Sequence, residues 1–482
     1  MEKLKFKLLF LVSIFFFFFS TGLFAQSVIY IDKDAIGDND GTSWGNAYKN
    51  LQDALNNAVA KDTLWVAAGT YYPDEGTGFQ DNARDSSFII PDSVKVYGGF
   101  EGTEQSLNER DLGGNATILS GDIDQNDSID NNNSIHVVVF EHVSPETILD
   151  GFTITHGYAD ASYPHNSGSG IFNDGTGNGE RSNPGIFNCI LTGNHGSSIY
   201  NYGRVAGQSS PLIVNCVFRG NMNGAMYNDG YGGESKPRII NCTFGGNQGH
   251  LKGALKNSGA ECSPLLVNCI IWGNEDSYQQ ISNSNGATVT FENCNVQGED
   301  LEGTSMSSDP FFIDLPDYNI APTTAGILKI YSNSPSVNTG NSVTVDTLIQ
   351  TDILGNPRIQ DGTVDMGAYE GGVTYDAQRI FVDQDATGNQ DGTSWTDAFT
   401  GLQDALDNAE FVDTIWVAEG TYYPEKDENG ESSPIDNRQK AFYIPSKINL
   451  YGGFAGNETT LSERVLDEHE TILSGDLGTV GD

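Results

Sequence analysis

The chain has 482 residues, with 65 acidic and 24 basic side chains and a formal net charge of −41. A charge this negative repels nucleic acid and anionic lipid, so neither is expected as a partner. The 57 glycines against 16 prolines point away from disorder and toward many tight turns, and the length exceeds that of one ordinary domain.

Residues 1–25 have the pattern of a secretory signal peptide. Basic residues precede an apolar run over residues 8–19, and a Leu-Phe-Ala cleavage site ends before Gln26. No later run is long enough for a membrane-spanning helix, and no cysteine follows the cleavage point for a lipid anchor. We therefore expect an exported protein, secreted or held at the cell surface, with no transmembrane segment.

Residues 26–125 are predicted to form an N-terminal cap and the first coils of a solenoid. An amphipathic helix is expected over about residues 47–60, between two short strands. Its apolar side carries Leu51, Leu55, Ala58 and Val59. A short helix ahead of the first coil covers the open end of a solenoid, where exposed strand edges would invite aggregation.

Residues 126–300 are predicted to form stacked coils, because one phrase returns five times at intervals of 27, 26, 27 and 25 residues, by subtraction of the cysteine numbers. The copies are Asn188-Cys189, Asn215-Cys216, Asn241-Cys242, Asn268-Cys269 and Asn293-Cys294. Apolar residues alternate within each copy, which excludes helical repeats. A fixed period with Gly and Asn turns predicts a parallel β-helix whose coils stack about 4.8 Å apart.

The repeated residues have structural explanations. The five cysteines are expected to form an inward column of buried free thiols, and Cys262 to be free outside that column. Two sets of asparagines are expected in turns, where their side chains bond to backbone groups and to each other. These are Asn194, Asn221, Asn247 and Asn274, and Asn173, Asn201, Asn228, Asn257 and Asn283.

The residues that alternate with the cysteines along these strands form an apolar stripe, and the sequence does not decide whether this stripe is exposed. If the cysteines point inward, the stripe points outward. It comprises Ile186, Ile190, Ile213, Val217, Leu266, Ile270 and Trp272. The stripe would be a binding surface if exposed, or it could be covered by a longer turn such as residues 157–170, or be buried on both faces. Exposed, Trp272 could stack on a sugar ring.

The cap then recurs near the end of the chain. Residues 301–372 form a closing segment, and residues 373–482 repeat the cap and first coils at an offset of 351 to 354 residues, so that Trp395 matches Trp44. The chain stops where the second copy would begin its coils. We expect residues 373–482 to be a truncated second copy.

Several of these motifs resemble a known family. They are Asp40-Gly41-Thr42-Ser43-Trp44, Gly69-Thr70-Tyr71-Tyr72-Pro73, the Asn-Cys coils, and Asp352-Ile353-Leu354-Gly355-Asn356-Pro357-Arg358 with Asp365-Met366-Gly367-Ala368-Tyr369-Glu370. The chain resembles secreted bacterial right-handed parallel β-helix proteins of the pectate-lyase-like and polymorphic outer-membrane repeat type, and its closing segment looks like a choice-of-anchor Q region. The resemblance implies an all-β, right-handed parallel β-helix and leaves function open, because the family includes lyases, hydrolases and adhesins.

Two carboxylates and two basic residues are the candidates for catalysis. Asp174 and Asp229 occupy the same turn position two coils apart, roughly 9 to 10 Å from each other, near the upper limit for an inverting glycosidase. A polysaccharide lyase would need a basic residue and a cation for the uronate, for which Arg219 and Lys252 are the candidates. Ordinary turn chemistry and solvated surface charge explain the same residues without catalysis.

Two acidic loops are candidates for calcium, which takes six to eight oxygen ligands from flexible loops. They contribute Asp32, Asp34, Asp38 and Asp40 from the cap, and Asp122, Asp124 and Asp127 from the loop before the coils. Solvated acidic loops are the alternative. Nearly every recurrent residue has a structural role, so the sequence favours a non-catalytic protein for surface display, adhesion or glycan binding over a polysaccharide lyase or glycoside hydrolase.

Overall fold

The structure is a computed structural model that describes residues 28–249, 254–275, 279–299, 301, 303–345, 350–360, 362–374, 377–410, 413–427, 430–445 and 448–477. The expected signal peptide, residues 1–25, lies outside the described residues, as does Lys252. The chain divides into two compact units, Met1–Val373 and Thr374–Asp482.

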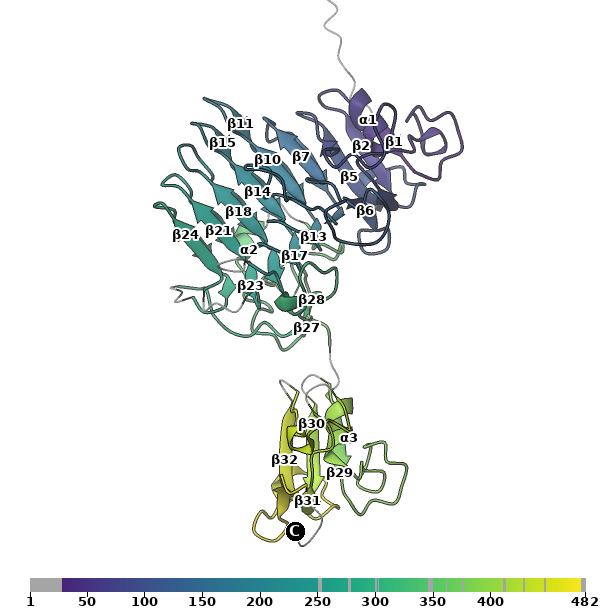
Figure 1. The fold of residues 1–482 in the computed structure, drawn as a ribbon, viewed down its shortest axis with the longest axis vertical. Coiled ribbons are helices and arrows are strands. Elements are labelled where there is room, and N and C mark those ends of the chain that lie inside the picture. Colours follow the sequence, from purple (N-terminus) through teal and green to yellow (C-terminus); the bar gives the residue numbers. More distant parts are fainter. Residues whose placement is uncertain are drawn as a thin grey trace, which may run out of the picture. The chain divides into compact units, whose positions relative to one another are not determined.

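The first unit is a right-handed parallel β-helix, as the sequence predicts, built from three parallel sheets (Figure 1). Sheet A has the order β1 (Val28–Ile31), β2 (Thr63–Ala67), β5 (Lys95–Phe100), β8 (Ile148–Asp150), β12 (Gly185–Phe187), β16 (Leu212–Val214), β19 (Arg238–Ile240), β22 (Leu265–Val267) and β25 (Thr290–Glu292). Sheet B has the order β3 (Gly69–Tyr71), β6 (Thr117–Ser120), β9 (Thr153–Thr155), β13 (Ile190–Thr192), β17 (Val217–Arg219), β20 (Thr243–Gly245), β23 (Ile270–Trp272) and β26 (Asn295–Val296). Sheet C has the order β4 (Phe88–Ile89), β7 (Val138–Glu141), β10 (Ile171–Asp174), β14 (Ile199–Tyr202), β18 (Met226–Asp229), β21 (Leu255–Ser258) and β24 (Ile281–Ser284).

Each coil passes through sheets A, B and C in turn, so a strand pairs with its counterpart in the next coil. Smaller elements complete the unit. They are the parallel pair β11 (Arg181–Ser182) and β15 (Gln208–Ser209), the antiparallel pair β27 (Phe312–Asp314) and β28 (Ile327–Ile330), α2 (Ser342–Val345), and the 3₁₀ helices Trp44–Asn46, Leu107–Glu109 and Tyr318–Ile320.

The cap helix is shorter than the sequence predicts. It is α1 (Leu51–Asn57), which contacts β1 and β4 and buries Leu51 and Leu55 in the core. Val59, expected on its apolar side, is 54% exposed. The chain turns there toward β2, because the Val59 N–H donates to the Asp62 carboxylate at 3.0 Å rather than continuing the helix.

The repeated Asn-Cys phrase forms the corner between sheets A and B. Its asparagine is left-handed in every coil, with φ between 50° and 54°, a conformation that Asn tolerates better than most residues. All six cysteines are free and buried, and five of them join the core cluster, so the inward column is confirmed. The asparagine also interrupts the in-and-out alternation of side chains. Ile186, two residues before Asn188, and Cys189, directly after it, both point into the core.

Because the alternation is interrupted at the corner, the prediction that the whole apolar stripe points outward is wrong in part. Ile186, Ile213 and Leu266 lie before the corner and are fully buried in the core. Ile190, Val217 and Ile270 follow the corner and do face outward from sheet B, but the closing segment covers them. Its contribution to this second cluster is Phe312, Leu328, Ile330, Ile353, Met366 and Ala368. The stripe is therefore covered by residues 301–372 and not by residues 157–170.

The predicted asparagine stacks are present inside the solenoid. In one ladder, side chains of successive coils bond at 3.0, 2.8 and 2.7 Å from Asn194 through Asn221 and Asn247 to Asn274. The second ladder runs from Asn173 to Asn283, with bonds of 2.8 to 3.0 Å. Its members lie within strands of sheet C and not in turns, because every second residue there faces the core.

In its described residues, the second unit contains two parallel sheets, an α-helix and two 3₁₀ helices, most of which correspond to cap elements of the first unit. They are β29 (Arg379–Val382), β30 (Thr414–Ala418) and β32 (Asn449–Phe454) in one parallel sheet, β31 (Gly420–Tyr422) with β33 (Thr471–Leu473), α3 (Leu402–Asn408), and the 3₁₀ helices Asn437–Gln439 and Leu461–Glu463. The rings of Trp395 and Trp416 lie 6.4 Å apart, as do those of Trp44 and Trp65 in the first unit. The repeated sequence therefore forms the repeated local structure.

Candidate functional site

The outer face of sheet C carries the candidate site. Strand alternation sends Ile171 and Asn173 of β10 into the core and Phe172 and Asp174 outward. The same parity in β7 turns Val139 and Glu141 outward, because Phe172 pairs with Val139 and Asp174 with Glu141. The outer face therefore presents an apolar row beside an acidic row.

Residues 157–170, the strap, run between β9 and β10 and pack on this outer face. His165 of the strap contacts His136, with 3.0 Å between its Nδ1 and Nε2 of His136, and its ring centroid lies 5.2 Å from that of Phe172. Further along the strap, the ring of Tyr163 lies 5.9 Å from that of Tyr202. Phe172 and Tyr200 are buried, so the strap leaves only part of the outer face open.

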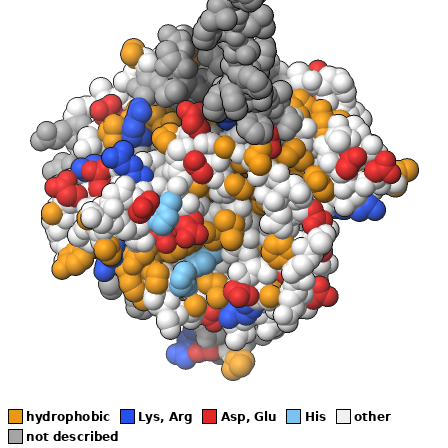
Figure 2. Space-filling model, turned by 90° about the horizontal axis from the view of Figure 1, so that it is seen from above, with side chains coloured by type: hydrophobic (Ala, Val, Ile, Leu, Met, Phe, Trp, Pro, Cys, Tyr) orange, Lys and Arg blue, Asp and Glu red, His pale blue; other side chains and the backbone are white. Residues whose placement is uncertain are grey.

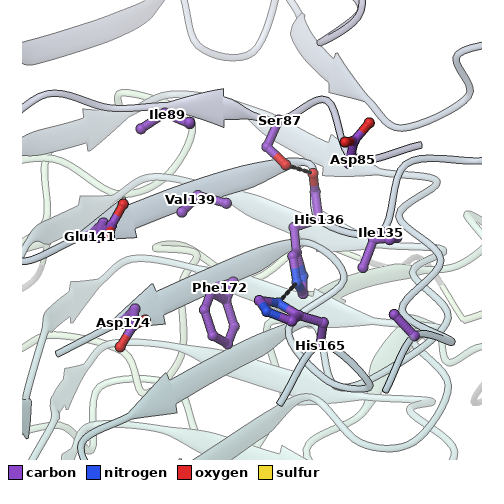
Figure 3. Close-up of a pocket in the computed structure, with 11 residues that line it drawn as sticks. Asp85, Ser87, Ile89, Ile135, His136, Val139, Glu141, His165, Phe172 and Asp174 are labelled. Carbon is purple, nitrogen blue, oxygen red and sulfur yellow. Dashed lines mark hydrogen bonds between the residues drawn. The ribbon is translucent and has the colours of Figure 1, made fainter. Parts of the chain in front are cut away.

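A pocket of about 360 Å³ lies at the edge of the strap (Figure 3). Its lining comes from β4, β7, β10, the residues before these strands and the strap. These residues are Asp85, Ser87, Ile89, Ile135, His136, Val139, Glu141, Ala161, His165, Phe172 and Asp174. Glu141 and Asp174 lie at one end and the two histidines at the other, with Ile89, Val139 and Phe172 between them. The pocket thus has an apolar floor between two polar ends.

The two histidines form a directional hydrogen-bonded pair. Burial lowers the pKa of His136 to about 4, so its ring is neutral at neutral pH. Its Nδ1 lies 2.9 Å from the Gly168 carbonyl oxygen, which can only accept, so Nδ1 carries the proton. The Nε2 of His136 must then accept from Nδ1 of His165.

Figure 2 shows histidine side chains lying among acidic and hydrophobic ones on one face of the molecule. Within the pocket, Glu141 and Asp174 are neighbours on adjacent coils, and Asp85 adds a third carboxylate. The Asp174 Oδ1 accepts from the N–H and the hydroxyl of Thr176, at 2.9 and 2.7 Å. Such a site can hold a ring against the floor and accept hydrogen bonds around it.

The proposed catalytic pair Asp174 and Asp229 has the predicted register, two coils apart with Tyr202 between. The two carboxylates have different surroundings. Asp174 lines the pocket, whereas Asp229 is fully buried and accepts from the Tyr200 hydroxyl at 2.9 Å. Asp229 also forms an ion pair with Nε of Arg204 at 2.8 Å. Its position gives it a structural role, and the pair does not share a pocket.

The other candidates lie on sheet B or outside the described residues. Arg219 ends β17 and lies near Tyr369 and Asp314, and burial lowers its pKa. Trp272 ends β23, is partly buried and packs against the cluster that joins sheet B to the closing segment. Lys252 is not among the described residues. The structure therefore does not bring Arg219 or Trp272 to the same face as Asp174.

Three of the seven aspartates proposed for calcium accept hydrogen bonds from backbone N–H groups of their own loops. Asp32 and Asp40 accept from the N–H groups two residues on, and Asp122 accepts from those of Asn126 and Asp127. Among the described residues, no three His, Cys, Asp or Glu side chains are grouped so that they could hold a metal ion. Asp34, Asp38, Asp124 and Asp127 complete the proposed set, and calcium binding stays a prediction.

Sequence reasoning missed Asp85, His136, Glu141 and His165. None of them belongs to a repeated phrase, and the pocket joins residues far apart along the chain: His136 and His165 are separated by 29 residues, and Asp85 and Asp174 by 89. His136 is the only one of the four with a recognisable signal, since it is a polar residue at the start of the apolar run that leads into strand β7. That position alone does not reveal a partner in the strap.

No protein-family model matches the chain, and no curated protein matches it. A rhamnogalacturonan lyase structure is similar, with 12% identity over 64% of this chain and 97% of that chain and a TM-score of 0.30. A pectate lyase has 14% identity over 73% and 98% and a TM-score of 0.23, and a pectin methylesterase has 12% identity over 94% of each chain and a TM-score of 0.22. A likeness of this degree says nothing about activity. Within the described part of the chain, no helix has the length and apolar character needed to cross a bilayer.

Proposed function

We propose that this chain is an exported β-helix protein that binds glycans at the pocket on the outer face of sheet C, without catalysis of its own. The observation that carries the proposal is the apolar floor of Ile89, Val139 and Phe172 between two polar ends. Sugar rings have apolar faces and polar edges, and binding sites of this kind combine apolar surface with a few placed polar groups. The N-terminal signal sequence supports export, and cell-surface display or adhesion would follow from it.

Binding is favoured over catalysis because the candidate catalytic residues do not converge. A hydrolase needs two carboxylates across one bond, and a lyase needs a base with a cation for the uronate. Asp229 is committed to Arg204 and Tyr200, and Arg219 lies on sheet B. A polysaccharide lyase or glycoside hydrolase remains the rival function, which would have to use Glu141 and Asp174.

The test is isothermal titration of the mature chain with neutral, amino-bearing and uronic oligosaccharides, beside assays for released reducing ends and unsaturated uronate. Ile89→Ser places a polar group in the floor at a residue that is 56% exposed, and it should weaken binding at least about fivefold. Ile36→Ser, at a residue 95% exposed in the cap, is the matched control and should leave binding unchanged.

Equal binding by both variants would contradict the location of the site, and no binding to any glycan would contradict the function. Product release that disappears in Glu141→Gln or Asp174→Asn would instead establish the hydrolase.

A further inference from the structure

The polar groups of the pocket share one property, which is that they accept hydrogen bonds. Asp85, Glu141 and Asp174 are carboxylates, and none of the described lining residues is Lys or Arg. The Ser87 hydroxyl donates to the His136 carbonyl oxygen at 2.6 Å, so its proton is already used and its oxygen offers only lone pairs. The pocket is therefore negative and poor in donors.

Both imidazole rings use their Nδ1 protons in hydrogen bonds within the protein. Because the Gly168 carbonyl fixes the proton of His136 on Nδ1, the shared hydrogen bond consumes the Nδ1 proton of His165. His165 lines the pocket, and its Nδ1 proton is therefore not available to a ligand. His136 is buried and acts here as a positioning residue, since it sets the tautomer of its neighbour.

We propose that this pocket selects a glycan unit that bears a free ammonium group, as in a de-N-acetylated amino sugar, over its N-acetylated and uronic counterparts. The inference rests on the proposed glycan binding and adds its substrate class. An ammonium group has three donors and a positive charge, which matches a site of carboxylates and lone pairs. A uronate brings another negative charge to a pocket without a cation, and an N-acetyl group offers one N–H and no charge.

The size of the preference follows from the exposure of the carboxylates. Glu141 is exposed and Asp174 is partly exposed, and the two lie at the same end of the pocket, so each contact with an ammonium group is worth about a two- to fivefold gain in affinity. Two such contacts predict a preference of about four- to twenty-five-fold over the N-acetylated ligand. The preference should fall as salt rises, because exposed charge pairs are screened.

The overall charge of −41 also attracts polycations, so the experiment must separate the pocket from the rest of the surface. Isothermal titration of the mature chain would compare glucosamine oligomers, N-acetylglucosamine oligomers of equal length and oligogalacturonate, between about pH 6 and 7, where a primary amine is largely protonated. Glu141→Gln removes one charge from the pocket. Glu146→Gln removes one charge from an exposed turn outside it.

We expect the glucosamine oligomer to bind tightest. Glu141→Gln should lower that affinity by about two- to fivefold, with a smaller change for the N-acetylated ligand, and Glu146→Gln should change neither affinity. Asp174→Asn should act as Glu141→Gln does, because the two carboxylates lie on paired residues of adjacent strands. Equal affinity for the amino and N-acetylated oligomers, or a preference for the uronate, would overturn the selectivity and leave glycan binding in place. An equal loss in Glu146→Gln would assign the preference to net charge and overturn it as well. Absence of binding to all three would overturn both proposals.

Discussion

Substitution of Asn221 by Ala should destabilise the solenoid far more than a surface substitution does. Asn221 lies in the middle of its ladder and is fully buried. Its Nδ2 donates to the Leu191 carbonyl at 2.9 Å and to Asn247 Oδ1 at 2.8 Å. Its Oδ1 accepts from Asn194 Nδ2 at 3.0 Å and from the Asn194 N–H at 3.2 Å. Alanine removes all four of these contacts.

The cost follows from which partners keep another hydrogen bond. Asn194 Nδ2 still donates to the carbonyls of Ile154 and Thr192, and Asn247 Oδ1 still accepts from the Asn221 N–H. The Asn194 N–H loses its side-chain partner inside the core, which costs about 1 to 3 kcal/mol. The lost bonds add about 1 kcal/mol each where they are not replaced, so the free energy of unfolding should fall by roughly 3 to 5 kcal/mol.

Urea unfolding followed by circular dichroism would measure this loss in the mature chain. Asn131→Ala is the control, because Asn131 is exposed in the loop before β7 and lies outside the ladder. It should change the free energy of unfolding by less than about 0.5 kcal/mol. If Asn221→Ala were no more destabilising than Asn131→Ala, the ladder would not hold the coils together as described.

Three further predictions concern stability. Burial lowers the pKa of His136 to about 4, below its usual 6.5, so the unfolded chain binds more protons between these values and stability should fall as pH drops from about 6.5 to 4. His136→Gln should flatten that dependence by up to about 3 kcal/mol in urea titrations at several pH values, and an unchanged slope would contradict a neutral buried ring. Burial raises the pKa of Glu370 to about 7, so its contribution to stability has the opposite sign, and stability should fall as pH rises from about 4.5 to 7. Glu370→Gln should remove that fall. If the fall persisted in the variant, another group would be its cause. Leu119→Ala should cost about 2 to 5 kcal/mol because Leu119 is fully buried, whereas Leu473→Ala, at the equivalent position and 47% exposed, should cost less than about 1 kcal/mol. Hydrogen exchange in each unit would measure both, and equal losses would contradict the difference in packing.

The sequence by itself determined the coils and their interior. Each coil stacks on a neighbour of similar sequence, so a residue that suits the core in one coil suits it in the next, and the pattern repeats at the coil length. The cysteine column and the two asparagine ladders could be predicted for this reason. The change in side-chain direction at the corner could not be predicted. The sequence pattern predicts side chains that alternate in and out without interruption, whereas the left-handed backbone of Asn188 breaks this alternation.

The tertiary structure alone decided what covers each outer face and where the site lies. The closing segment covers sheet B through contacts such as that of Asn215 with the Thr351 carbonyl, 136 residues away. The pocket depends on His136 meeting His165, which lies in a strap between two coils. Such contacts join segments that occur once, so no periodicity marks them. Their pairing is set by the path of the chain around the solenoid, and that path exists only once the coils have stacked.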